Sequence, residues 1–354
     1  MAIHLAHEYK IKGHFLSSNL SLTQINKGIQ GKQIMTSKII GTGSYVPVQV
    51  VTNDDLAKIV DTNDEWITGR TGIRERRVVM EEGTSHMAVE AARRALDNAG
   101  VKPEELDLIL LGTASPDHCF PSGACEVQGA LEAVNACAFD ISAACSGFLF
   151  ALNTMQAFIQ AGIYRTGLVI GADCLSKLVD WKDRGTCVLF GDGAGAAVVR
   201  AEDKGMTHTV MRSDGAKWQV LSCISRTNGN FLNHQTPEPG YISMDGQEVF
   251  KFAVKKVPEC IQQVILESNL SMDDIKYFVL HQANYRIIES VAKRLKQPMD
   301  KFPMNMDHYG NTSAASVPIL LDEMNRTGRL KTGDRIVLSG FGGGLTWGAT
   351  LLEW

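Results

Sequence analysis

The sequence is poor in long apolar runs and in positive charge. Its apolar stretches, such as residues 108–111 and 168–170, are far shorter than the roughly 20 residues that a helix needs to cross a bilayer. The formal net charge of the 354 residues is −4, which gives no general attraction to nucleic acid or to an anionic membrane. The short runs are therefore predicted to be buried strands, and neither nucleic acid nor a membrane is expected as a partner.

Metal and disulfide frameworks are also missing. No two of the eight cysteines form a CxxC pair and no secretory signal precedes them, so neither a zinc site nor a set of disulfides is indicated. A reduced, cytoplasmic protein without a metal is expected, in which most cysteines are small buried hydrophobic residues. The eight are Cys119, Cys125, Cys137, Cys145, Cys174, Cys187, Cys223 and Cys260.

The glycine-rich segments lack the other parts of a phosphate-binding loop. Residues 191–195 (Gly-Asp-Gly-Ala-Gly) are not followed by Gly-Lys-Ser or Gly-Lys-Thr. Gly41 and Gly43 are not followed by the third glycine of a dinucleotide fingerprint. The sequence therefore does not support chemistry on nucleotide phosphates.

Residues 1–36 differ in composition from the rest. They mix His, Ser, Asn and Lys with single apolar residues, and Glu8 is the only acid before Met35. An ordered arm, a targeting segment and an upstream start all fit; because arginine and an apolar core segment are missing, we expect a flexible extension. The first core strand is expected to begin at Ser37, followed by a turn at residues 41–43.

What the chain does contain is an internal duplication. A helical pattern, an acidic turn and an apolar strand at residues 87–111 recur in the same order at residues 254–280. Residues 139–145 then lead into one predicted helix, and residues 310–316 lead into another. The chain therefore divides into the extension, a first half, 37–205, and a second half, 206–354.

This alternation predicts the fold class. Helices that alternate with apolar strands are typical of mainly parallel sheets with helices on both faces. With 354 residues, 44% of them hydrophobic, the chain is long enough for two such halves. Two halves that share one core predict a five-layered α/β/α/β/α protein.

Cys145 stands where a strand pattern gives way to a helix pattern. Apolar residues continue at helical spacing from Phe148 to Ile159, and Gly162 is suited to end the helix. A thiol at such a junction faces the positive end of the helix dipole, which favours the thiolate. From this context alone, a buried structural cysteine is the simpler interpretation.

Three further segments place polar or flexible residues at strand ends. His281 follows an apolar strand, at the edge where open α/β folds place their sites. Asn311 lies in Gly-Asn-Thr-Ser, which by itself is equally typical of a turn and helix cap. Residues 340–344 (Gly-Phe-Gly-Gly-Gly) allow backbone N–H groups to face a ligand, or form a tight turn.

Taken together, these segments resemble a known family. Residues 143–147, 281–284, 310–316 and 340–344 occur in the order of β-ketoacyl-acyl-carrier-protein synthase III, a condensing enzyme of the thiolase superfamily, and residues 64–76 resemble it too. The resemblance covers about residues 37–354. It implies a thiolase-like duplicated five-layer fold and a cytoplasmic homodimer that initiates fatty acid synthesis.

The resemblance also implies a role for each catalytic residue. Cys145 takes the acyl group from an acyl-CoA, and His281 and Asn311 bind the carbonyl of malonyl-acyl-carrier protein; the products are 3-ketoacyl-acyl-carrier protein, CoA and CO2. The backbone N–H groups of Cys145 and Gly343 form the oxyanion hole. Elongating relatives carry a second histidine in place of Asn311, so the initiating type is favoured. No cofactor is implied, because the CoA thioester is a substrate.

The binding residues follow from the same resemblance. Trp66 and Arg184 are expected to flank the adenine of CoA, with Arg70 near its phosphates. Phe120 is expected to close the acyl pocket of the partner subunit. Residues 217–241 follow no pattern of the family, which leaves the acyl-chain preference open. Along the pantetheine and active-site walls the resemblance places Met244, Gly246, Phe250, Asn284 and Phe341.

A basic docking face is expected for the acidic carrier protein. Arg286, Lys293 and Arg294 lie on one predicted helix after His281, and Lys251 is assigned to the same face. An ordinary solvated face is the alternative.

Other functions fit less well. A degradative thiolase, or a relative that moves the acyl group to oxygen or nitrogen, would keep the fold and Cys145. A thiolase normally needs another catalytic cysteine near its C-terminus, and none follows Cys260. Retention of Cys145, His281 and Asn311 argues against a non-catalytic partner subunit. A condensing enzyme or acyltransferase of secondary metabolism is the remaining alternative.

Overall fold

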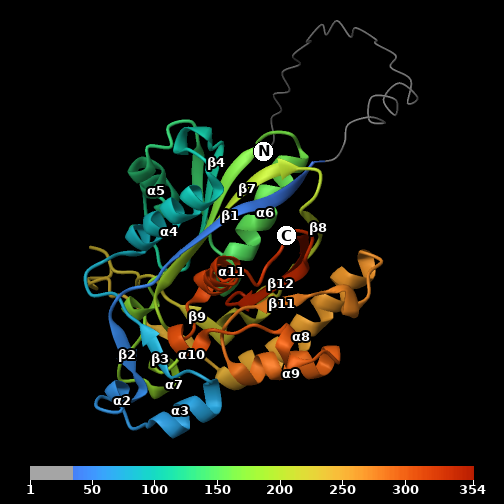
Figure 1. Ribbon diagram of the computed structural model, residues 1–354. Helices are drawn as coiled ribbons and strands as arrows, with labels where there is room; N and C mark the ends of the chain where they lie inside the picture. The colour runs from blue at the N-terminus through green and yellow to red at the C-terminus, as the bar shows by residue number, and fades with distance from the viewer. Residues whose placement is uncertain (1–34) are drawn as a thin grey trace, which may run out of the picture. The chain divides into compact units, whose positions relative to one another are not determined.

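Two β-sheets organise residues 35–354, which are the residues that the computed structural model describes (Figure 1). The first sheet has the order β1 (Thr36–Tyr45), β7 (Gly193–Glu202), β6 (Thr166–Asp173), β4 (Leu108–Gly112) and β5 (Cys137–Ile141). The second has the order β11 (Tyr277–Leu280), β12 (Arg335–Gly342), β13 (Thr346–Glu353) and β8 (Met206–Ser213). The expected extension, residues 1–36, lies outside the described residues except for its last two.

Helices cover both faces of each sheet. α4 (Thr84–Ala99) and α5 (Gly123–Leu131) pack on the outer face of the first sheet, and α8 (Gly246–Glu267) and α9 (Tyr285–Leu295) pack outside the second. α6 (Gly147–Gln160) and α11 (Ser316–Arg326) lie between the sheets. The predicted five-layered α/β/α/β/α arrangement is therefore confirmed.

The apolar runs are buried because helices cover both sheet faces. In β4, Leu108 and Leu110 pack into the central layer, whereas Ile109 and Leu111 pack against α4 and α5. Successive side chains of a strand point to opposite faces, so a strand that is covered twice needs apolar residues at every position. None of the helices in residues 35–354 is long and apolar enough to span a membrane.

The prediction of mainly parallel sheets is wrong. β6, β4 and β5 run parallel, but β7 is antiparallel to both β1 and β6. In the second sheet only β11 and β12 are parallel. A short turn joins β12 to β13, and such a connection makes only antiparallel pairs, whereas a parallel pair needs a longer crossover.

The internal duplication is confirmed in three dimensions. α4, the 3₁₀ turn η1 (Pro103–Glu105) and β4 recur as α8, η5 (Met272–Asp274) and β11. The repeated unit places the ends of β4 and β11 at corresponding positions in the two sheets, one followed by Thr113 and the other by His281.

The turn predicted at residues 41–43 is instead part of β1. A Cβ added at Gly41 would lie 2.6 Å from the Cβ of Ala99, and one added at Gly43 would lie 2.3 Å from the backbone nitrogen of Ala95. These glycines therefore allow α4 to pack directly on the strand, and they do not end it. The register shifts locally between Ile39 and Gly41.

Candidate active site

Cys145 lies between β5 and α6, in the short 3₁₀ turn η2 (Ala144–Ser146). Ala144 has φ +45°, a left-handed conformation that is uncommon outside glycine and often found at functional sites. α6 ends at Gln160, and Gly162 adopts φ +72° two residues later. The predicted strand-to-helix junction and helix end are confirmed.

Two cavities meet at Cys145. One, of about 280 Å³, contains nine of the residues that the sequence assigned to the channel or to catalysis besides Cys145. The other, of about 370 Å³, includes Gly343, Leu175 and Leu178 in its wall. Cys145, Phe190 and Leu221 line both cavities. The nine are Trp66, Arg70, Met244, Gly246, Phe250, His281, Asn284, Asn311 and Phe341.

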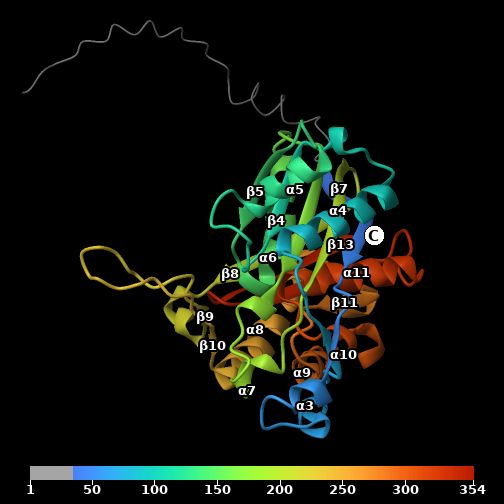
Figure 2. The same ribbon diagram turned by 90° about the vertical axis from the view of Figure 1, so that its left-hand side faces the viewer.

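The second cavity is bounded partly by the segment that follows no family pattern. β9 (Leu221–Cys223) pairs with β10 (Ile242–Met244), and Cys223 and Ile242 line the cavity. Figure 2 shows the connection between the two strands extending away from the rest of the fold. β9, near the start of residues 217–241, therefore contacts the site, and so does β10, which follows them, whereas residues 224–241 line neither cavity.

Trp66 and Arg70 stand one turn apart on α3 (Asp64–Thr71), so they share a face of that helix. The guanidinium carbon of Arg70 lies 4.6 Å from the centroid of the Trp66 ring, and that of Arg184 lies 4.8 Å from it. Arg184 thus stacks directly on the tryptophan. An adenine between these two side chains requires the Arg184 guanidinium to move.

His281 is a neutral side chain held in one orientation. Burial lowers its pKa to about 3, so it carries no charge at neutral pH. The N–H of Gln282 donates to Oγ of Ser316 at 3.2 Å, and the Ser316 hydroxyl lies 2.6 Å from Nδ1 of His281. The Ser316 oxygen accepts from Gln282 and can donate its proton to Nδ1; in this tautomer the imidazole proton is on Nε2.

Asn311 is also a neutral donor. Its Oδ1 accepts the backbone N–H of Ser313 at 2.9 Å, which leaves the side-chain NH2 group free to donate. Its backbone N–H donates to the carbonyl of Leu189, and its carbonyl accepts from the N–H of Gly191. Asn311 and His281 therefore present two uncharged donors to the same cavity.

The half-buried Cys145 thiol does not have the lowered pKa that its position at a helix start predicts. Burial raises its pKa to about 12, and the Asp173 carboxylate adds a smaller effect in the same direction. Desolvation is thus the largest influence on this thiol, and it favours the neutral form. The hydroxyl of Ser313 donates to Sγ of Cys145 at 3.3 Å.

Asp173 is a buried carboxylate that sequence reasoning missed. Its Oδ1 accepts from Thr113, Ala114 and Ser115 at 2.7–3.0 Å, and its Oδ2 accepts the N–H of Ala314 at 3.1 Å. It thereby joins the ends of β4 and β6 to the 3₁₀ turn η7 (Ser313–Ala315). The sequence pattern could have identified it, because Asp173 is a polar residue at the end of an apolar strand and His281 directly follows such a strand.

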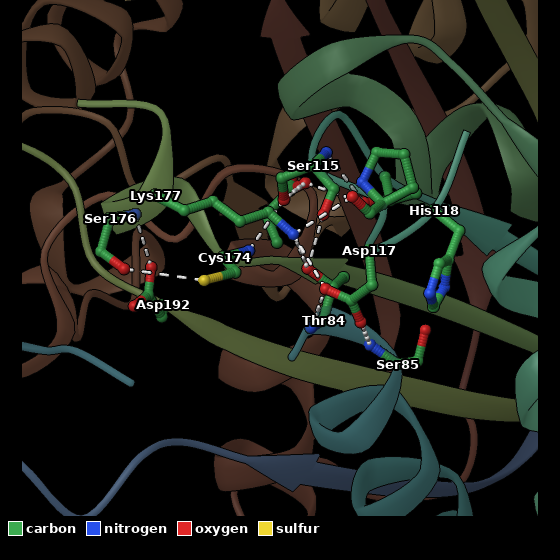
Figure 3. A network of polar contacts seen from close by, with 12 residues as sticks. Thr84, Ser85, Ser115, Asp117, His118, Cys174, Ser176, Lys177 and Asp192 are labelled. Atoms are coloured by element: carbon green, nitrogen blue, oxygen red, sulfur yellow. Dashed lines mark hydrogen bonds and ion pairs between the residues drawn. The ribbon is translucent and has the colours of Figure 1, made fainter. Parts of the chain in front are cut away.

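A second polar network fixes the wall of the larger cavity (Figure 3). Nζ of Lys177 lies 2.9 Å from Oδ1 of Asp117, and Asp117 accepts the N–H groups of Thr84 and Ser85 at the start of α4. Asp192 accepts the N–H of Ser176 at 2.9 Å. The segment that supplies Leu175 and Leu178 is therefore held from both sides.

The expectation that most cysteines are buried is wrong. Cys119, Cys125, Cys137 and Cys223 are exposed, and only Cys174, Cys187 and Cys260 are fully buried. Cys137 begins β5, an edge strand that has a neighbouring strand on one side only. All eight lie in the described part of the chain and all are free thiols.

The predicted docking residues are exposed on the two outer helices. Arg286, Lys293 and Arg294 belong to α9, as predicted, and Lys251 belongs to α8. Lys251 forms an ion pair with Glu248 at 2.8 Å, and Arg286 donates to the carbonyl of Gly69 at 2.7 Å. Phe120 is 85% exposed and does not line either cavity of its own chain.

Sequence models of one family match two parts of the chain. The model for 3-oxoacyl-[acyl-carrier-protein (ACP)] synthase III matches residues 139–215, which contain Cys145. The model for the C-terminal part of 3-oxoacyl-[acyl-carrier-protein (ACP)] synthase III matches residues 265–354, which contain His281 and Asn311.

Similar proteins extend over most of the chain. Beta-ketoacyl-[acyl-carrier-protein] synthase III of Clostridium acetobutylicum is 53% identical over 322 residues, which are 90% of this chain and 98% of that relative. 3-Oxoacyl-[acyl-carrier-protein] synthase III from Aquifex aeolicus VF5 has a crystal structure that matches with a TM-score of 0.84 at 48% identity, covering 90% of this chain and 100% of that one. The priming beta-ketosynthase from the R1128 polyketide biosynthetic pathway matches with a TM-score of 0.84 at 35% identity, covering 91% and 97%. This chain therefore belongs to the β-ketoacyl-acyl-carrier-protein synthase III family.

Proposed function

We propose that this protein condenses an acyl-CoA with malonyl-acyl-carrier protein to give 3-ketoacyl-acyl-carrier protein, CoA and CO2, and so initiates fatty acid synthesis. One observation carries the proposal: Cys145 lies at the junction of two cavities, and the two neutral donors His281 and Asn311 line one of them. The thiol can therefore hold an acyl group in one cavity while a second thioester enters through the other.

In the first half-reaction, Cys145 attacks the acyl-CoA carbonyl. CoA lies in the cavity lined by Trp66 and Arg70, and the acyl chain occupies the other cavity. A thiolate suits this step because it keeps the acyl group as a reactive thioester. A Cβ added at Gly342 would lie 2.7 Å from the backbone nitrogen of Cys145, so the end of β12 packs directly on the nucleophile and brings Gly343 beside it. This packing supports an oxyanion hole made by the N–H groups of Cys145 and Gly343.

In the second half-reaction, malonyl thioester loses CO2 and leaves an enolate. Its oxygen needs hydrogen-bond donors that do not give up a proton and quench the carbanion. Nε2–H of neutral His281 and the NH2 group of Asn311 meet this requirement, and each donor contributes roughly 2.7–4 kcal/mol by analogy with other oxyanion sites. The carbanion then attacks the Cys145 thioester.

A priming enzyme of polyketide synthesis is the second candidate, because such a protein shares the fold. Its 35% identity is well below the 53% shared with the clostridial fatty-acid-type relative. The proposed reaction itself needs no metal or redox cofactor. A cytoplasmic location belongs to the same proposal, and the eight free thiols support it.

The test is an intact-mass experiment with defined substrates. The protein is incubated with a panel of straight and branched acyl-CoAs, weighed, and then given malonyl-carrier protein. The proposal requires one acyl mass per chain, followed by its release as 3-ketoacyl-carrier protein with CO2. Acylation without a condensed product would instead indicate an acyltransferase.

We further propose that the protein works as a homodimer. β5 is an edge strand of the first sheet, and the nearby Phe120 is 85% exposed. A second copy that covers this face would bury Phe120 in its acyl cavity and remove the open edge.

The dimer prediction is tested by light scattering after gel filtration. The native protein should have the mass of two chains, and Phe120→Asp should shift it toward one chain at micromolar concentration, because a carboxylate is costly to bury in an apolar pocket. Leu266→Asp, which changes a 77% exposed residue of α8, is the matched control and should stay dimeric. A native protein with the mass of one chain contradicts the proposal.

Arg286, in the first turn of α9, lies beside the channel entrance, and Lys293 and Arg294 lie in the last turn of the same helix. Arg286 donates to the carbonyl of Gly69, and Asn284 donates to the carbonyl of Arg70, so the start of α9 is tied to the helix that carries Trp66. We propose that Lys251, Arg286, Lys293 and Arg294 receive the acidic carrier protein, whose pantetheine arm enters this cavity.

Charge reversal tests the docking face. The double variant Lys293→Glu/Arg294→Glu should raise the KM for malonyl-carrier protein about tenfold or more at low salt, and the difference should shrink as salt shortens the Debye length to about 8 Å at 0.15 M. The KM for acyl-CoA should change little. Lys102→Glu, on the opposite half of the chain, is the control; equal KM values for the carrier in both variants and the native protein exclude the proposed face.

A further inference from the structure

Ser313 contacts both the nucleophile and Asn311. Its hydroxyl donates to Sγ of Cys145 at 3.3 Å, and its backbone N–H donates to Oδ1 of Asn311 at 2.9 Å. The residue is 1% exposed and adopts φ +52°, a conformation that serine rarely takes. The surrounding structure holds this strained residue in place, because Asp173 accepts the N–H of the next residue, Ala314.

The charged surroundings of Cys145 do not favour a thiolate. Asp173, at the end of β6, raises the pKa of the thiol by its electrostatic effect. His281, at the end of β11, is neutral because burial lowers its pKa to about 3. Among the described side chains, the Ser313 hydroxyl is the one whose hydrogen bond lowers the pKa of Cys145.

We propose that the Ser313 hydroxyl is a catalytic group of the acylation step, where it donates a hydrogen bond to the Cys145 sulfur as that sulfur becomes negative. The bond between Sγ and the acyl carbon forms as the bond to the CoA sulfur breaks, and the proton lost by Cys145 ends on the CoA thiol. A thioester sulfur is a weak acceptor, so this hydrogen bond is strongest before acylation. This role of Ser313 rests on the proposed function in one respect only, namely that the group attacked by Cys145 is the carbonyl of an acyl-CoA.

The expected effect of removing the Ser313 hydroxyl on the rate can be calculated from general values for hydrogen bonds and thiols. A hydrogen bond to a charged group shifts a pKa by about one to two units. Nucleophilicity falls as a thiol becomes more acidic, with a Brønsted slope of about 0.4–0.5, so roughly half of the shift appears in the rate. Removing the hydroxyl should therefore slow attack by Cys145 about three- to tenfold at any pH well below its pKa.

The test measures the reactivity of Cys145 directly, with an electrophile whose reaction does not depend on the condensation activity. Iodoacetamide is added to the full-length protein at pH 6–9, and alkylation of the Cys145 peptide is followed by mass spectrometry, because four other cysteines are exposed. The rate should rise about tenfold per pH unit in every protein, since the pKa of Cys145 is about 12. At each pH, the alkylation rates of Ser313→Ala and Ser313→Gly should be three- to tenfold lower than the rate of the native protein.

Two variants separate the hydroxyl from the backbone. Ser313→Ala keeps the Cβ, and with it the strain of the positive φ, and removes only the hydroxyl, whereas Ser313→Gly also removes the Cβ and relieves that strain. Ser146→Ala removes a buried hydroxyl next to Cys145 that bonds to the carbonyl of Ala143 and to Thr346, and should leave the alkylation line unchanged.

A second readout follows the half-reactions. The acyl-CoA burst should slow by the same three- to tenfold factor in both Ser313 variants, while decarboxylation by the pre-acylated protein changes less than twofold. A native alkylation rate in Ser313→Ala overturns the proposal and assigns Ser313 a structural role. Slow alkylation in a protein that makes no condensed product would overturn the proposed function but leave the role of Ser313 intact.

Discussion

Cys145→Ala is expected to take up no acyl group and to lose condensation by about 10⁴-fold or more, the scale on which loss of a nucleophile disables other covalent enzymes. The reason is positional. Among the cysteines, all of which lie in the described residues, Cys145 alone lines both cavities. An acyl group on this sulfur is thus the one that malonyl thioester can reach in the other cavity. Intact mass and peptide mapping after incubation with acyl-CoA measure the effect.

The other cysteines provide the controls for this experiment. Cys125→Ala removes an exposed thiol away from the cavities and should leave acylation at one group per chain. Cys223 is the informative competitor, because it lines the larger cavity but not the smaller one. An acyl group found on the Cys223 peptide in the native protein would contradict the assignment of Cys145.

Asn311→Ala is expected to slow condensation about 10²–10³-fold while burst acylation changes far less. Acyl transfer needs the Cys145 thiolate and the oxyanion hole, whereas decarboxylation needs donors directed at the malonyl carbonyl. The Asn311 amide takes no proton from Cys145 at neutral pH. Rapid-quench measurements of acylation and of CO2 release separate the two steps.

The alanine variant also removes the acceptor for the Ser313 N–H, so a second variant is needed. Asn311→Asp keeps an oxygen in that place and loses the NH2 donor. If the donor matters, CO2 release falls in both variants. Equal losses of acylation and decarboxylation in Asn311→Ala, with near-native CO2 release in Asn311→Asp, would show that Asn311 shapes the site and does not bind the enolate.

A substitution of His281 would be harder to interpret in the same experiment. Its ring lies edge-on to Phe341, with 5.2 Å between the centroids, and its Nδ1 is tied to Ser316. Substitution therefore changes the packing beside the channel as well as the donor. Because the pKa of His281 is about 3, its protonation should not limit activity between pH 5 and 9.

Local pattern and the order of short motifs were enough to predict several parts of this protein. Apolar runs at residues 108–111 and 168–170 identify buried strands, and the repeat of residues 87–111 at 254–280 identifies the duplicated five-layer fold. Cys145, His281 and Asn311 follow from short segments at strand ends. These features are readable because side-chain periodicity and turn chemistry act over a few neighbouring residues.

Features that depend on contacts between residues far apart in the sequence could not be predicted and appear only in the folded protein. Ser313 reaches Cys145 across 168 residues of sequence, and Asp173 reaches Ala314 across 141. Strand direction depended on which strands became neighbours, and the exposure of Cys137 depended on β5 being an edge. Desolvation raised the pKa of Cys145 although its position at a helix start predicted the opposite, because burial is the sum of all surrounding atoms and no local pattern records that sum.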